Sequence, residues 1–209
     1  MNIVFDFGVV LFDWQPATFL AQTFPERIPS PEAARHMAHA IFSHADWHAF
    51  DRGTMAMHEV VHNTAERLDL PHAQFNELVQ RIGEYLLPVA GTVALLEQLA
   101  AHRAKHGDLK LYFLSNMPVP YARELEQRHA FLKHFDGGIF SGDVKLIKPE
   151  PGIYALLEQR YGLVPADTLF IDDLKANVAA AQAWGWQGIH FESPVQLGAA
   201  LKAVLGEAA

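Results

Sequence analysis

Short apolar runs alternate with segments of helical spacing through the second half of the chain, and this alternation constrains the fold most strongly. The apolar runs are residues 109–114, 138–140, 168–171 and 187–191. The helical segments around them are residues 89–105, 119–128, 152–161, 175–184 and 195–205. Strands that alternate with helices form parallel sheets, because each crossover returns the chain to the same edge. The sequence therefore predicts an α/β protein whose strands end at one common edge.

The chain begins with a further strand that ends in a carboxylate. Residues 3–5 are apolar, Asp6 follows them directly, and Gly8 permits a tight turn with uncovered backbone amides. Ligands of α/β proteins bind outside the carboxyl ends of the strands. Asp6 is therefore a candidate site residue, although an aspartate after a strand also commonly caps a turn or a helix.

Residues 15–86 carry helical spacing without any strand signal. The predicted helices are residues 17–23, 32–43, 56–68 and 71–86. Such a run is too long for a crossover, so we expect an inserted, all-helical subdomain. The predicted domains are an α/β core of residues 1–14 and 87–209 and a helical cap of residues 15–86.

Polar residues end three of the predicted strands and should meet at one edge: Asp6, then Ser115 with Asn116, then Asp172 with Asp173. Carboxylates held close together need a positive partner. Mg²⁺ takes oxygen ligands and commonly shares its shell with phosphate. Lys148 would add a positive charge if its loop folds inward, although it could also be an ordinary solvated lysine. Together these residues predict a phosphate pocket with a metal at its side.

Charge and composition argue against several classes of protein. The chain has 16 basic and 24 acidic residues, a net charge of −8, and no basic cluster, so we expect no nucleic-acid or membrane partner. The absence of cysteine excludes a disulfide scaffold and thiolate chemistry. No window approaches the roughly 20 apolar residues of a membrane span, and no signal peptide is visible. We expect a cytoplasmic protein; its oligomeric state stays open, with a monomer among the options.

Four motifs in order resemble the haloacid dehalogenase superfamily. FDFGVVLFDW resembles its first motif, LYFLSN its second, IKPEPGIY its lysine motif and LFIDDLKAN its acidic motif. The resemblance implies a Rossmann-like parallel sheet with a helical cap between the first two motifs. The opening and the KPEPGIY stretch are most similar to the helical-cap phosphatases that include α-D-glucose-1-phosphate phosphatase.

The resemblance also implies a role for each residue of the edge. Asp6 would attack phosphorus and form an aspartyl-phosphate, while Lys148 neutralises charge. Phosphate would be held by Phe7 and Gly8 through their backbone, and by Ser115, Asn116 and Lys148. Mg²⁺ would be held by Asp6, the Gly8 carbonyl and Asp173, with Asp172 as a further ligand or a partner beside them. The expected reaction is Mg²⁺-dependent hydrolysis of a small phosphorylated metabolite, such as a sugar phosphate.

Gly8 departs from the family pattern. Many of these phosphatases carry a second aspartate two residues after the nucleophile, as general acid and base, and its loss typically costs about 10²- to 10⁴-fold. Asp13 is a candidate substitute, although it could equally cap the next helix. The departure leaves two alternatives open: a 2-haloacid dehalogenase, in which Asp6 attacks carbon without a metal, and a binding module without turnover. The Asp172–Asp173 pair favours a metal and phosphorus.

Two features of residues 15–86 suggest other chemistry. His58, Glu59 and His62 spell the HExxH pattern of zinc peptidases on a predicted helix, but without the extension HxxGxxH, so we expect a chance match. The stretch WHAFDRG resembles the cap turn of related phosphatases, so Asp51 and Arg52 are candidates to hydrogen-bond a sugar-like substrate. We expect the aromatic residues of this region to form the core of the cap: Phe42, Trp47 and Phe50.

Overall fold

Five parallel strands form one sheet in the computed structural model, which describes residues 1–206. The strands are β1 (Asn2–Phe5), β2 (Lys110–Ser115), β3 (Gly137–Phe140), β4 (Thr168–Asp172) and β5 (Gln187–His190). Their order across the sheet is β3-β2-β1-β4-β5, and all neighbours run parallel. This confirms the predicted α/β fold; residues 207–209 of the predicted core lie outside the described residues.

β1 lies at the centre of the sheet because its side chains are apolar on both faces. Ile3 and Phe5 pack into one hydrophobic core and Val4 into a second core on the opposite face, and all three side chains are fully buried. Ile3 is in register with Leu111 of β2 and with Leu169 of β4. A continuous apolar run is typical of a strand covered on both faces. The first carboxylate of the site therefore follows the most enclosed strand.

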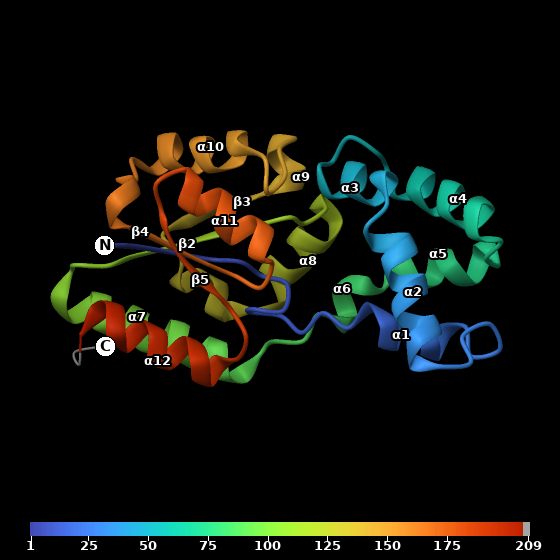
Figure 1. Cartoon of the computed structure of the whole chain (residues 1–209), viewed down its shortest axis with the longest axis horizontal. Coiled ribbons are helices and arrows are strands. Elements are labelled where there is room, and N and C mark those ends of the chain that lie inside the picture. Colours follow the sequence, from blue (N-terminus) through green and yellow to red (C-terminus); the bar gives the residue numbers. More distant parts are fainter. Residues whose placement is uncertain (207–209) are drawn as a thin grey trace.

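Helices cover both faces of the sheet (Figure 1). One face carries α7 (Ala90–His106) and α12 (Pro194–Leu205), and the other carries α10 (Pro151–Tyr161) and α11 (Lys175–Ala183). The remaining core elements are α8 (Val119–Arg128), η1 (Ala130–His134), α9 (Ser141–Val144) and η2 (Pro165–Asp167). In the described part of the chain, no helix combines the length and the apolar character that a bilayer crossing would need.

The regular elements between β1 and α7 are all helices. Its helices are α1 (Pro16–Thr23), α2 (Pro31–Phe42), α3 (Ala45–Asp51), α4 (Met57–Leu68), α5 (His72–Gln80) and α6 (Ile82–Tyr85). Figure 1 places α1 to α5 beside the sheet and away from its two faces. The predicted boundaries at residues 15 and 86 stay a prediction.

The predicted helix of residues 71–86 is wrong in one respect, because it is interrupted at Arg81. This residue has φ −99° and ψ 3°, which ends α5 before α6 begins. α6 then packs closely on α8: a Cβ on Gly83 would collide with the Glu124 carboxylate, and Arg128 donates to the Gly83 carbonyl at 3.2 Å. The break therefore follows from contact between two elements that are distant in sequence.

Two linkers join the helical insertion to the sheet, and they are hydrogen-bonded to each other. The Asp13 amide donates to the Leu87 carbonyl at 2.7 Å, and the Val89 amide donates to the Leu11 carbonyl at 2.8 Å. The chain therefore leaves and re-enters the core as a paired ribbon.

Candidate active site

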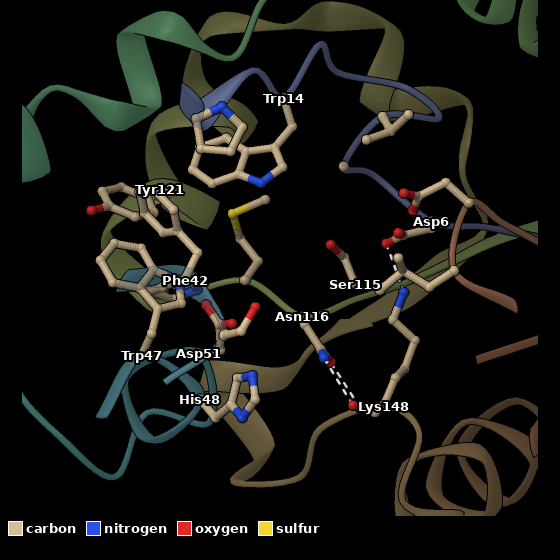
Figure 2. A pocket seen from close by; sticks show the side chains of 18 of the residues that line it. Asp6, Trp14, Phe42, Trp47, His48, Asp51, Ser115, Asn116, Tyr121 and Lys148 are labelled. Carbon is tan, nitrogen blue, oxygen red and sulfur yellow. Dashed lines mark hydrogen bonds and ion pairs between the residues drawn. The ribbon is translucent and has the colours of Figure 1, made fainter. Parts of the chain in front are cut away.

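The carboxyl ends of three neighbouring strands bring the predicted polar residues together. Asp6 follows β1, Ser115 ends β2 and Asp172 ends β4, and the Asp6 amide continues the pairing by donating to Ile171 at 2.9 Å. Carboxylate oxygens of Asp6, Asp172 and Asp173 lie within 4.8 Å of one another. Figure 2 shows Lys148 reaching this edge from the loop before α10.

Lys148 is a buried ammonium shared by two carboxylates. Its Nζ lies 2.8 Å from Asp6 Oδ1 and 2.6 Å from Asp172 Oδ2, and its side chain is 1% exposed. Burial alone would lower the pKa of Lys148, but the charges of Asp172 and Asp6 outweigh it and raise this pKa above its ordinary value. The structure therefore excludes a solvated lysine here and supplies a fixed positive charge beside Asp6.

The Asp172 side chain is fully occupied by hydrogen bonds. Oδ1 accepts from the Leu174 amide at 2.8 Å and from Asn177 Nδ2 at 3.0 Å, and Oδ2 accepts from the same Asn177 nitrogen and from Lys148. Asp172 is therefore suited to hold Lys148 and a poor candidate for a direct metal ligand. Sequence reasoning did not single out Asn177, although it closes the acidic motif LFIDDLKAN.

Asn116 clamps the backbone of the lysine loop. Its Nδ2 donates to the Lys148 carbonyl at 3.0 Å and its Oδ1 accepts from the Lys148 amide at 2.8 Å. One Nδ2 hydrogen is left for a phosphate oxygen, so the structure adds a positioning role to the predicted one. Ser115, which is 1% exposed, lies beside it in the cavity wall.

The donor set of the acidic cluster fits a hard divalent cation. The cluster holds three carboxylates and one ammonium, which contacts two of them, and this leaves an excess of negative charge. Burial, opposed by Lys148 and reinforced by the charge of Asp172, raises the pKa of Asp6 to about 7. Burial and the charge of Asp172 raise the pKa of Asp173 to about 6. Asp6 and Asp173 would hold the cation through oxygen, the donor that Mg²⁺ prefers.

The turn after Asp6 contributes backbone to the site. The Phe7 side chain is fully buried and packs 4.9 Å from the Phe113 ring, so only its main chain can meet a ligand. The Gly8 carbonyl accepts from the Val10 amide at 2.6 Å, which leaves one lone pair for a metal. A Cβ added at Gly8 would meet nothing within 4 Å. The position is thus open enough for a side chain.

A cavity of about 420 Å³ extends from the sheet edge toward the helical insertion (Figure 2). At the sheet edge its wall includes Asp6, Gly8, Ser115, Asn116, Lys148, Asp173 and Asn177. Toward the insertion it includes Trp14, Phe42, Trp47, His48, Asp51 and Tyr121. Sequence reasoning missed Trp14 and Tyr121, and it expected Phe42 and Trp47 only in the cap core. The tryptophan that ends the first motif, FDFGVVLFDW, was the available signal.

Of the further candidates Asp13, Asp51 and Arg52, only Asp51 lines the cavity. Burial raises the pKa of its carboxyl well above the ordinary value, with Lys148 opposing the shift. Arg52 instead pairs with Glu150, Nη1 to Oε2 at 2.7 Å. Asp13 is exposed and accepts from the Gln15 side chain at 2.8 Å. The structure therefore does not bring Asp13 or Arg52 to the site.

The zinc-peptidase alternative finds no metal site in residues 1–206. His58, Glu59 and His62 are exposed on α4. Glu59 accepts from the Ala56 amide at 2.8 Å and so closes the start of its own helix, and His62 lies 3.5 Å from Glu66. The acidic cluster at the sheet edge is the one group of three metal-binding side chains within these residues. The HExxH pattern is a coincidence of helical spacing.

Comparison with known proteins identifies one family. Residues 3–185 match the family described as haloacid dehalogenase-like hydrolase. A sesquiterpene phosphatase of Aspergillus oryzae is 26% identical over 203 residues, which span 97% of this chain and 95% of that protein.

Two solved structures share the fold. A haloacid dehalogenase family enzyme of Bacteroides thetaiotaomicron, in complex with magnesium and inorganic phosphate, has a TM-score of 0.70 and 18% identity, and the match covers 92% of this chain and 94% of that one. The L-2-haloacid dehalogenase of Xanthobacter autotrophicus has a TM-score of 0.64 and 22% identity, with coverage of 100% and 84%.

Proposed function

The chain belongs to the haloacid dehalogenase-like hydrolase family, and from this premise we propose that it is a Mg²⁺-dependent phosphatase of a small phosphate monoester. The observation that carries the proposal is the grouping at the sheet edge. The Asp6 carboxylate faces the buried Lys148 ammonium at 2.8 Å and lies beside the carboxylates of Asp172 and Asp173. A nucleophile, a fixed cation and an oxygen-only metal site together suit the transfer of a phosphoryl group.

Asp6 would act as the nucleophile through the oxygen that does not contact Lys148. A bond forms between this oxygen and phosphorus as the ester P–O bond breaks, and the released alkoxide takes up a proton. Water then attacks the phosphorus of the aspartyl-phosphate and releases inorganic phosphate and the Asp6 carboxylate. Lys148 would stabilise charge on the phosphoryl oxygens, and Ser115 would donate a hydrogen bond to one of them.

Asp6 and Asp173 would hold the metal, and Asp172 would serve Lys148. Bound Mg²⁺ would supply positive charge to the phosphoryl oxygens. The Bacteroides thetaiotaomicron enzyme, which shares the fold, was solved with magnesium and inorganic phosphate, and this supports the choice of Mg²⁺ as the cation.

The named relative favours phosphorus over a carbon–halogen bond. The Aspergillus oryzae sesquiterpene phosphatase matches along nearly the whole chain. A dehalogenase would need no cation, and the acidic cluster would then have no use. The closer resemblance to the α-D-glucose-1-phosphate phosphatase branch stays a prediction.

Phosphate release from a panel of esters tests the proposal. With Mg²⁺ we expect turnover of several esters, loss of turnover with a chelator, and recovery on adding Mg²⁺. Asp6→Asn should abolish turnover. The control Asp69→Asn should not, because the Asp69 side chain is 98% exposed at the C-terminal end of α4. Halide release from 2-haloacids without any metal requirement, or no phosphate from any ester, would contradict the proposal.

A further inference from the structure

We infer that the organic group of the substrate is a hydrocarbon of isoprenoid or long-alkyl type, which lies in the cavity between the sheet edge and the helical insertion. The inference rests on the proposed phosphatase function, because it requires the phosphate to lie against Asp6 and Lys148. It differs from the sugar-like substrate that the sequence predicts. The lining of the cavity carries the argument.

Beyond the sheet edge, the deep wall of the cavity is apolar. Five of its residues are each at most 6% exposed, and none carries a charge: Trp47, Ile82, Leu86, Met117 and Tyr121. The cavity of about 420 Å³ falls within the range of about 300 to 1,000 Å³ usual for small-molecule sites. A ligand that reaches from the phosphate position into this space must cover apolar surface.

Four aromatic side chains, Trp14, Phe42, Trp47 and Tyr121, form what we call the aromatic wall (Figure 2). Trp14 and Phe42 meet edge to face with ring centroids 5.0 Å apart, and Phe42 meets Trp47 at 4.5 Å. Phe50 connects Trp47 to Tyr121 by two further edge-to-face contacts, at 5.5 and 5.7 Å. These contacts fix the rings in place.

The polar end of Tyr121 is not available to a ligand. Its hydroxyl donates to the Val79 carbonyl at 2.6 Å in a buried hydrogen bond. Tyr121 therefore offers its ring to the cavity and keeps its hydroxyl behind the wall. An apolar group suits that ring better than a sugar hydroxyl does.

Apart from the buried Asp51, the polar residues toward the insertion lie at the mouth of the cavity or outside it. His39, Ser43 and His48 line the cavity but are exposed, so they form its rim. Arg52, the predicted sugar contact, is paired with Glu150 instead. Asp51 is the one acidic side chain that the insertion contributes to the described lining. A sugar needs a hydrogen-bond partner for each buried hydroxyl, and Asp51 alone cannot supply them all.

A chain-length series tests the inference. Methyl, dimethylallyl, geranyl and farnesyl monophosphates would be compared with glucose 1-phosphate and glucose 6-phosphate by phosphate release. Each methylene that enters an apolar site contributes about fourfold in affinity. We therefore expect kcat/KM to rise by at least about tenfold with each added isoprene unit until the cavity is full. Sugar phosphates that match or exceed the prenyl esters would overturn the inference and leave the proposed phosphatase function standing.

Two variants probe the wall itself. Trp14→Ala should lower the ratio of kcat/KM for farnesyl over methyl phosphate by at least about tenfold, because a large apolar contact is lost. Trp184 caps the C-terminal end of α11, is 37% exposed and does not line the cavity, so Trp184→Ala should leave the ratio unchanged. If Trp14→Ala does not fold, Ala38→Leu fills the same cavity and should shift the preference to shorter chains. An unchanged ratio in a folded cavity variant would refute the inference.

A binding measurement separates the two levels of the argument. Trp14 and Trp47 report on ligands through their fluorescence, so the Asp6→Asn variant would be titrated with farnesyl monophosphate and glucose 1-phosphate in the presence of Mg²⁺. Tighter binding of the prenyl ester supports the inference even if no ester is turned over. The absence of turnover would count only against the proposed phosphatase function. Equal or weaker binding of the prenyl ester would overturn the inference.

Discussion

Replacing Gly8 by aspartate should create a proton donor where the related phosphatases carry one. The position has room, since an added Cβ meets nothing within 4 Å and the backbone is not in the left-handed region. An aspartate there would follow the nucleophile Asp6 by two residues, on the turn that ends the central strand. We expect Gly8→Asp to gain activity rather than lose it.

The size of the gain depends on the leaving group. A well-placed general acid is worth about 10²- to 10⁴-fold in rate. At about 1.36 kcal/mol for each factor of ten, this is about 2.7 to 5.4 kcal/mol of transition-state free energy. An alkyl phosphate, whose alkoxide must be protonated, should show the whole gain. Acetyl phosphate, whose leaving carboxylate needs no proton, should show almost none.

The assay is kcat for the alkyl phosphate and for acetyl phosphate in three proteins: the native protein, Gly8→Asp and Gly8→Asn. The asparagine has nearly the same shape and cannot donate a carboxylic proton, so it controls for changes in packing. A gain that is equal in Gly8→Asn, or equal for both substrates, would refute the reasoning. No gain at all would mean that the native protein already protonates its leaving group by another route.

Three further predictions concern charged side chains. Lys148→Met leaves two buried carboxylates without their partner, so the free energy of unfolding, measured by urea titration, should fall by about 3–5 kcal/mol. A loss below about 1 kcal/mol would contradict the buried pairing. The pKa of Asp51 is raised in the folded state, so above about pH 4 the ionisation of this carboxyl destabilises the folded state relative to the unfolded one. The melting temperature of Asp51→Asn, relative to that of the native protein, should therefore rise with pH. A difference that does not change with pH would argue against burial of this carboxyl. Arg52→Ala should lower the free energy of unfolding by at most about 1 kcal/mol, because Arg52 belongs to a partly exposed ion pair. It should also leave KM unchanged across the ester panel. A raised KM would show that Arg52 contacts the substrate.

The core of the fold was predictable because its signals are local. Each strand is a short apolar run, and its polar end lies at a known edge once the strands are parallel. The helices began one residue earlier than expected at four prolines, which occupy the first helical position: Pro16, Pro31, Pro151 and Pro194. The approach of Asp6, Lys148 and Asp173 follows from this topology.

Features that depend on contacts between distant segments could not be predicted. The break at Arg81 reflects packing of Gly83 on α8, which no local pattern contains. The helix α3 was not expected, since the seven residues Ala45–Asp51 are too few for a clear periodic signal. The aromatic wall joins Trp14 to Tyr121 across the whole insertion, and spacing in the sequence does not reveal such a contact.

The hydrogen-bonded linkers limit how the helical insertion can move. Residues 11–13 and 87–89 are tied together, so one linker cannot swing without carrying the other. Because Trp14 follows the first linker directly and Leu86 precedes the second, bending of the ribbon would displace both side chains at once. Entry of a ligand and retention of its apolar tail would therefore depend on the same pair of hydrogen-bonded linkers.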